Sequence, residues 1–201
     1  MTGIALVPPP RSLTTMQPFF RELAVNRETA LALMDGLTDS QLAWRPTPAH
    51  WSLADICGHL ATAAELYLTE LDTAISRGHT DAAYSDRPFT GTMLSRLIVW
   101  SMEPPVRVRM RSPKDMRPDP GELPVHARQR YRTAQRNLAV RMERAAGLDL
   151  AHVRVRLPEI RQIRLSLGGV LALLLAHERR HLWQATVVRQ ASAFPDAIGG
   201  P

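Results

Sequence analysis

The sequence predicts an all-α protein built as a helical bundle. Aromatic residues make up only 5% of the 201 residues, and runs of β-branched residues are scarce, so the composition disfavours strands. Several long stretches carry apolar residues at the spacing of an amphipathic helix. A chain of this length fits one domain with an ample core. We therefore expect a single helical domain over residues 12–193, between a flexible Pro-rich segment at 1–11 and a loose tail at 194–201.

The first two predicted helices lie on either side of a connector that contains prolines. The first covers about residues 14–35, and Gly36 can end it because glycine readily adopts the left-handed conformation of a helix C-terminus. The second covers about residues 52–77. Ser52 is a natural N-cap for it, and Asp55 three residues later completes the pattern of a capping box.

The second half of the chain predicts three further helices. The shortest covers about residues 91–102, and the other two cover about 122–146 and 166–190. Residues 103–121 contain five prolines, so we expect no regular structure there. Apolar residues alternate at 153–157, which favours a short extended segment. Four long helices, one short helix and long Pro-rich crossovers thus form the expected bundle, and their spacing leaves its topology open.

The chain shows no segment that predicts a membrane or secreted protein. Its longest apolar stretch, Leu165–Ala176, is far shorter than the ~20 residues that a spanning helix needs. The first residues lack the basic region and the long apolar run of a signal peptide. Cys57 is the one cysteine, so no internal disulfide can form and a reducing compartment is favoured. We expect a cytoplasmic protein that does not bind membranes.

The positive charge of the chain is carried almost entirely by arginine. Lysine and arginine number 25, the net charge is +6, and two clusters stand out at residues 107–117 and 128–144. Neither cluster contains a platform of aromatic residues on which bases could stack. We expect solvated helix faces rather than a nucleic-acid interface, although an anionic small molecule could use some of these arginines.

Two histidines, His177 and His181, are spaced by one helical turn in the last predicted helix. Residues four apart share one face of a helix, so both imidazoles can reach the same ion. Neutral imidazole is a good ligand for zinc, nickel, copper and ferrous iron. The segment also matches the zinc-peptidase pattern H-E-x-x-H, in which Glu178 would be the general base.

The peptidase interpretation lacks a third metal ligand. No histidine or glutamate follows His181, and Asp196 is the one acidic residue after it. His59 is a better candidate because it lies on the apolar stripe of the second predicted helix, where an isolated histidine more often plays a core role. A bundle that aligns this helix with the last one could bring His59, His177 and His181 to one ion. The zinc-peptidase function remains the less favoured alternative.

Several motifs together resemble one known family. They are W-R-P at 44–46, W-S-L-A-D-I at 51–56 followed by G-H-L at 58–60, and H-E-R-R-H-L-W-Q at 177–184. Their order and spacing resemble the DinB/YfiT-like (damage-inducible DinB-like) superfamily over nearly the whole chain. The resemblance implies a four-helix bundle with up-down-down-up connectivity, commonly a homodimer.

The resemblance also implies a metal site. Carried over by position, it assigns His59, His177 and His181 as ligands of a divalent ion. Nickel or zinc is the first choice for that ion, and iron, manganese and copper are also compatible with histidine ligands. The implied functions are a metal-dependent thiol S-transferase, which joins a low-molecular-weight thiol to a small electrophile, or a hydrolase of a small molecule. A non-catalytic metal-binding protein of a stress response is the alternative.

Two residues near the histidines are candidates for catalytic or positioning roles. On an ideal helix Glu178 lies beside the line of the ligands, so it fits a general base or a surface residue paired with arginine equally well. Gln184 lies nearer the histidine face. It could orient a ligand or a bound water molecule, or instead cap a backbone group between helices.

Overall fold

The structure, a computed structural model, describes residues 15–78, 89–106 and 112–195. It is an all-α fold, as the sequence predicts, and it also contains one small hairpin. In chain order the elements are α2 (Gln17–Met34), α3 (Asp39–Ala43), α4 (Leu53–Arg77), α5 (Met93–Met102), the 3-10 turn η1 (Lys114–Met116), α6 (Pro124–Ala145), β1 (Arg154–Arg156), β2 (Arg164–Ser166) and α7 (Leu167–Arg189).

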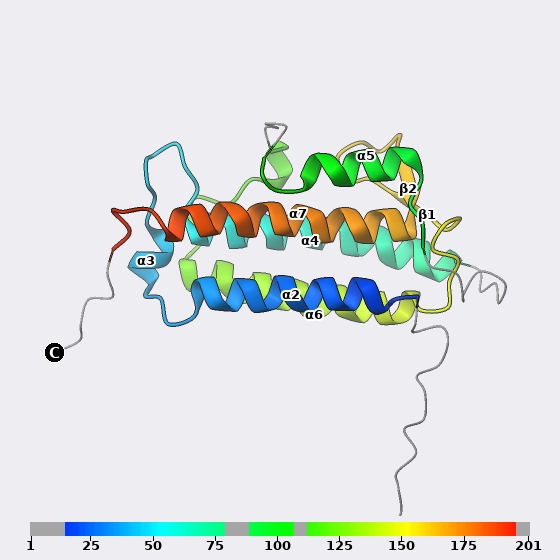
Figure 1. Ribbon diagram of the computed structural model, residues 1–201, viewed down its shortest axis with the longest axis horizontal. Helices are drawn as coiled ribbons and strands as arrows, with labels where there is room; N and C mark the ends of the chain where they lie inside the picture. Colours follow the sequence, from blue (N-terminus) through cyan, green and yellow to red (C-terminus); the bar gives the residue numbers. More distant parts are fainter. Residues whose placement is uncertain (1–14, 79–88, 107–111, 196–201) are drawn as a thin grey trace, which may run out of the picture.

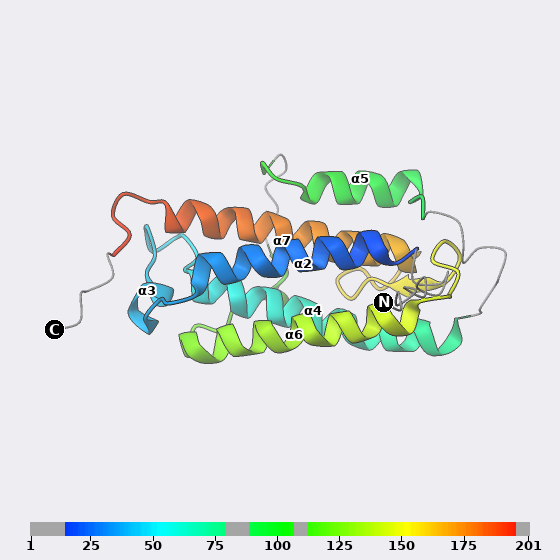
Figure 2. The same cartoon turned by 60° about the horizontal axis from the view of Figure 1, so that its bottom comes forward.

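The four longest described helices, α2, α4, α6 and α7, lie side by side along the long axis of the molecule (Figures 1 and 2). The colours of Figure 1 show that α2 and α7 run in one direction and that α4 and α6 run in the other. Ion pairs follow the parallel course of α4 and α6. Glu65 pairs with Arg130, and further along both helices Asp72 pairs with Arg141. The helix α5 packs on the outside of α7.

Two of the long helices begin or end at the capping residues that the sequence predicts. Ser52 caps α4, since its Oγ accepts a hydrogen bond from the backbone N–H of Asp55 at 3.0 Å. In return, the carboxylate of Asp55 accepts from the backbone N–H of Ser52 at 2.7 Å. After α2, Gly36 adopts a φ of +75°, the left-handed conformation that other residues disfavour. These local signals fix where the helix that carries His59 begins.

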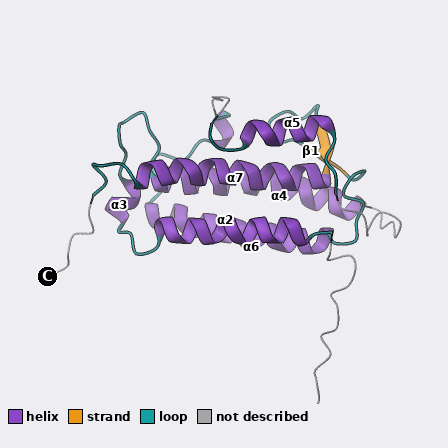
Figure 3. Ribbon diagram, viewed as in Figure 1, coloured by secondary structure: helices purple, strands orange, loops and turns teal. Residues whose placement is uncertain are grey.

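A two-stranded hairpin closes one end of the bundle (Figure 3). The alternating stretch forms β1, as expected, and β1 pairs with β2 in antiparallel register. Val155 and Leu165 face each other across the hairpin and are buried in the core. On the other face, Arg156 stands opposite Arg164, and both are exposed. The sequence did not predict β2, because Leu165 is the one apolar residue in it and no alternation shows, whereas three apolar residues alternate at 153–157 around β1.

The structure corrects two sequence predictions. Residues 103–121 are not wholly irregular, because Lys114–Met116 form one 3-10 turn. Pro113 and Pro118 flank this turn and restrict it to a single turn, since neither can donate a backbone hydrogen bond. The loose tail was expected from residue 194, but Phe194 is buried against Trp44 in an edge-to-face contact. The segment 1–11 and the rest of the tail beyond 195 lie outside the described residues.

The buried apolar residues form two clusters along the bundle. One surrounds the hairpin and the start of α7, and the other lies around α3 and the start of α4. No helix in the described part of the chain combines the length and the apolar character that crossing a membrane requires. The second cluster supports the end of the bundle where the histidines lie.

Candidate metal centre

Three imidazole rings from two helices meet inside the bundle. His59 lies near the start of α4, and His177 and His181 lie one turn apart, at the middle of α7 and just beyond it. The Nε2 atom of His59 is 3.2 Å from that of His177 and 3.1 Å from that of His181. The Nε2 atoms of His177 and His181 are 3.1 Å apart. Because α4 and α7 are antiparallel, the structure brings together all three residues that the sequence proposes as ligands.

The second ring nitrogen is already engaged in two of these histidines. Nδ1 of His59 lies 2.5 Å from the backbone oxygen of Met116, and Nδ1 of His181 lies 2.8 Å from Oε1 of Gln184. Both oxygens are acceptors, so each Nδ1 carries a proton and donates it. In a neutral imidazole the other nitrogen then has only a lone pair to offer. The Nε2 lone pairs of His59 and His181 therefore point into the triangle.

The protein environment keeps the three rings neutral. Burial lowers the pKa of His59, although its hydrogen bond to Met116 opposes the shift. Burial also lowers the pKa of His177 to about 3, and the charges of His59 and Arg180 add to this effect. The pKa of His181 falls well below its ordinary value, first through burial and then through the two neighbouring histidines. Neutral imidazole is the form that binds a metal ion.

The triangle fits a divalent metal ion. Converging lone pairs repel one another, and they cannot form hydrogen bonds among themselves when the protons are on Nδ1. A cation among the three nitrogens removes this repulsion. With metal–nitrogen distances of about 2.0 Å, tetrahedral ligands lie roughly 3.3 Å apart, which is close to the separations of 3.1 and 3.2 Å between the Nε2 atoms. Three largely buried histidines could thus hold a divalent ion.

A family model confirms the resemblance that the motifs indicate. The model of the DinB superfamily matches residues 22–185, which include all three histidines. The chain belongs to the DinB superfamily. No curated protein and no solved structure matches the sequence. The function of this DinB-superfamily protein must therefore be inferred from its own residues.

Trp51 forms one wall of the histidine cluster in this DinB-superfamily protein. Its ring stacks on His181 with centroids 5.7 Å apart and lies 4.8 Å from the ring of His59. Among the described residues, no fourth histidine, cysteine or carboxylate joins the cluster. Three protein ligands leave a coordination position open, as catalytic sites require. The cluster reaches the surface at His177, which is only partly buried.

Glu178 does not belong to the histidine cluster. It is also not a surface residue paired with arginine, which was one of the two roles expected from its position on the helix. It is buried, with an exposed fraction of 3%. Its Oε1 accepts a hydrogen bond from the hydroxyl of Tyr131 at 2.5 Å, and its Oε2 accepts one from Nδ2 of Asn26 at 3.0 Å. Burial raises the pKa of Glu178 to about 7, although both hydrogen bonds oppose the shift. A carboxylate with both oxygens held by α2 and α6 is poorly placed to serve as the base of a peptidase.

Gln184 is in hydrogen-bonding contact with the histidine cluster, as one of its two expected functions requires. Its Oε1 accepts from His181 and so fixes the tautomer of that ring. The partner of His59, the backbone oxygen of Met116, had no signal in the sequence because any residue carries such an oxygen. Asn26 and Tyr131 were also missed. Asn26 could have been noticed, since it is a polar residue on the apolar stripe of α2.

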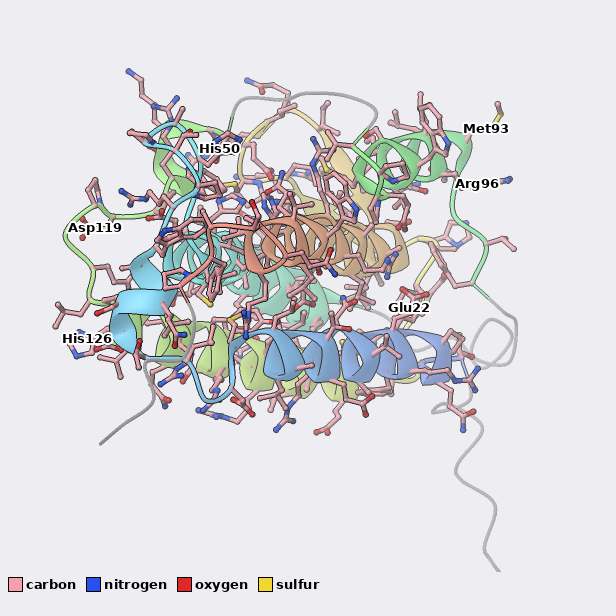
Figure 4. All side chains as sticks on the ribbon, turned by 60° about the vertical axis from the view of Figure 1, so that its left-hand side comes forward. Glu22, His50, Met93, Arg96, Asp119 and His126 are labelled. Atoms are coloured by element: carbon pink, nitrogen blue, oxygen red, sulfur yellow. The ribbon has the colours of Figure 1, made fainter. Side chains whose placement is uncertain are left out.

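The other histidines that the structure describes, and the cysteine, lie outside the histidine cluster. His79 is outside the described residues. His50 and His126 are at the periphery in Figure 4 and are exposed, as is His152. Cys57 is buried beside Met34, with 3.1 Å between the two sulfur atoms. None of these residues belongs to the cluster of possible metal ligands.

The arginine cluster at 128–144 is largely occupied by ion pairs within the fold. These pairs join α6 to the residue that follows α2, to α4 and to the loop before α6, at N–O distances between 2.5 and 2.9 Å. They are Arg130 with Glu65 and Glu122, Arg132 with Asp35, and Arg141 and Arg144 with Asp72. Of the cluster at 107–117, residues 107–111 lie outside the described part of the chain.

Proposed function

We propose that this protein is a metal-dependent enzyme that activates a small nucleophile, in the first instance a low-molecular-weight thiol, for transfer to an electrophilic small molecule. The observation that carries the proposal is the convergence of three Nε2 atoms while the Nδ1 atoms of His59 and His181 are held by other acceptors. This arrangement serves ion binding better than it serves packing, because it leaves lone pairs facing one another.

The residues around the cluster hold the ligands in place. Met116 and Gln184 fix the tautomers of His59 and His181, so neither ring must rotate before it binds an ion. Trp51 shields the rings of His59 and His181 on one side. A substrate must therefore approach from the side where His177 is partly exposed.

A bound divalent ion would supply a Lewis acid that lowers the pKa of a thiol or a water molecule at its open position. Neutral histidines leave the full positive charge of the ion in place, and no carboxylate among the described residues contacts the cluster to reduce it. The family membership supports the metal site. A thiol nucleophile gives a transferase, and water in the same position gives a hydrolase.

Metal analysis of the purified protein tests the site itself. We expect about one equivalent of a divalent ion in the wild type and a loss of most of it in His59→Ala and His177→Ala. His126→Ala is the matched control, because His126 is exposed and lies outside the cluster. Retention of the full metal content in His59→Ala would refute the three-histidine site.

An activity screen tests the reaction. Low-molecular-weight thiols are incubated with a generic electrophile such as a chloronitrobenzene, with and without a chelator, and in parallel with ester and amide substrates. Thiol conjugation that the chelator and His177→Ala both abolish supports the transferase. Metal-dependent ester or amide cleavage alone would reassign the protein as a hydrolase. A loaded metal site with neither activity would favour the non-catalytic metal-binding protein.

A further inference from the structure

A pocket lies at the end of the bundle opposite the histidine cluster. It is formed by the last turns of α4, the loop after α6 and the hairpin, and its volume is about 360 Å³. Figure 1 shows the hairpin and the C-terminal end of α4 together at this end of the molecule. The lining residues are Glu70, Thr73, Ala74, Arg77, Asp149, His152, Val153, Arg154, Arg156 and Arg164.

Four guanidinium groups gather at this pocket. Arg154 and Arg156 are both exposed and separated by the buried Val155, so they share the outer face of β1. Arg164 is exposed on β2, directly opposite Arg156 in the register of the hairpin. Arg77 is exposed in the last turn of α4 and lines the same pocket.

The hairpin places two positive charges, those of Arg156 and Arg164, directly opposite each other, and no contact within the described part of the fold explains this. Directly opposed residues in an antiparallel pair lie about 5 Å apart at Cβ, and like charges there are destabilising. Within the described residues, Arg77, Arg154, Arg156 and Arg164 form no ion pair. Four arginines of α6, in contrast, are paired with carboxylates: Arg130, Arg132, Arg141 and Arg144. An anion between Arg156 and Arg164 would remove the repulsion.

The acidic residues of the pocket do not neutralise this charge. Asp149 is engaged by the ring of His152 at 2.7 Å and by the backbone N–H groups of Ala151 and His152. Glu70 is the other carboxylate in the lining, and it stands against four arginines. The balance of the pocket is therefore positive.

We propose that this pocket binds the phosphate group of a small molecule, with Arg156 and Arg164 as the principal contacts and Arg77 and Arg154 beside them. Guanidinium groups bind phosphate oxygens in a bidentate manner, and adjacent arginines suit a group that carries two negative charges. A volume of about 360 Å³ is sufficient for a phosphorylated small molecule. The site does not depend on the proposed metal chemistry, because it shares no residue with the histidine cluster.

The test measures binding of inorganic pyrophosphate to the purified full-length protein by isothermal titration calorimetry, with total ionic strength held constant by sodium chloride. The double variant Arg156→Gln/Arg164→Gln should bind pyrophosphate at least about tenfold more weakly than the wild type, because it loses two charge-assisted contacts. A matched control, Arg21→Gln/Arg27→Gln, removes the same charge from exposed positions on α2. We expect it to change the affinity by less than roughly twofold.

Three outcomes would overturn the proposal. They are no binding to the wild type at millimolar pyrophosphate, equal weakening in the two double variants, and loss of binding in His59→Ala. The last would place the anion at the histidine cluster. If His59→Ala instead binds pyrophosphate as the wild type does, the two sites are separate, whatever the outcome of the metal analysis.

A stability measurement separates binding from a structural role of the arginines. In low salt without pyrophosphate, Arg156→Gln should raise Tm by about 1–2 °C, because it relieves repulsion across the hairpin. Pyrophosphate should then raise the Tm of the wild type more than that of the variant. A lower Tm of Arg156→Gln in the absence of ligand would contradict the proposed repulsion, and with it the argument for an anion.

Discussion

Gln184 is a single side chain whose only described hydrogen bond is to a proposed ligand, so its role can be isolated by substitution. We expect Gln184→Leu to keep the size of the side chain and to weaken zinc binding about 10–100-fold, the usual effect of losing a partner that orients a ligand. Competition with a chromophoric zinc chelator measures the affinity. Gln190→Leu, an exposed position just after α7, is the control. Equal zinc affinities for the two variants would show that the hydrogen bond from His181 to Gln184 does not contribute to metal binding.

Cys57 is a second residue whose chemistry follows from its surroundings. Burial raises the pKa of its thiol to about 12. Thiolate is the reactive form, so at pH 8 native protein should react with iodoacetamide far more slowly than unfolded protein. Mass spectrometry of the native chain and of the chain in denaturant measures the rates. Similar rates in both states would show that the start of α4 opens readily.

The residues of the site differ in how far the sequence could predict them. The spacing of His177 and His181 was sufficient to place both rings on one face, and the apolar stripe of α4 was sufficient to turn His59 inward. The position of Glu178 could not be resolved in the same way. Its environment depends on Asn26 and Tyr131, which come from two other helices, and no local pattern reports such a contact.

At the scale of elements, the start of α4 contains a salt bridge that makes its stability depend on pH. Burial alone would raise the pKa of Asp55, but the hydrogen bonds from Arg45 and Ser52 outweigh it, so the pKa lies below its ordinary value of 3.8. A carboxyl group with a lowered pKa stabilises the fold above that ordinary value, and the contribution is lost as the pH falls through the lowered pKa.

The variant Asp55→Asn should therefore reduce the free energy of unfolding by about 2 kcal/mol at pH 7, since it weakens charge-assisted hydrogen bonds to a buried group. The difference from the wild type should shrink as the pH falls below 3.8. Denaturant unfolding at several pH values measures it. Asp35→Asn is the control, because Asp35 pairs with Arg132 at the surface and both side chains are exposed. A difference that stays constant down to pH 2.5 would contradict the role of the ionised carboxylate.

The elements that the sequence predicted best are those with strong local signals. α4 begins at a capping box, and α2 is followed by a left-handed glycine, so their bounds agree with prediction to within a few residues. The elements that it missed, β2 and η1, are three residues long. Neither has the alternating apolar residues that predicted the equally short β1, so no periodic pattern reveals them.

At the scale of the whole molecule, a bound metal ion should link α4 to α7 and so stabilise the fold. At a free zinc concentration of about 100 times Kd, binding stabilises the fold by about 2.7 kcal/mol. For a chain of this length that corresponds to a rise in Tm of roughly 5–10 °C. Thermal unfolding with zinc and with chelator measures the shift. His59→Ala should show almost none of it, and a full shift in that variant would place the ion elsewhere.

The overall architecture was largely predictable, whereas the arrangement that completes the site was not. The helical periods and the family motifs predict the bundle, but the distance between His59 and His177 is set by packing between residues 118 positions apart in the chain. The Pro-rich connector shows the same limit. The sequence predicts it only as a crossover between helices, yet its backbone carries the oxygen that accepts the hydrogen bond of His59.

That oxygen belongs to the main chain, and so no side-chain replacement at Met116 can delete it. An alanine scan of this protein would find the three histidines and Gln184 and would pass over the acceptor of His59. Only a change in the path of the connector, such as an inserted or deleted residue between 112 and 118, would move it. The length of this loop can thus change the metal affinity of the site, although the loop contains none of the ligands.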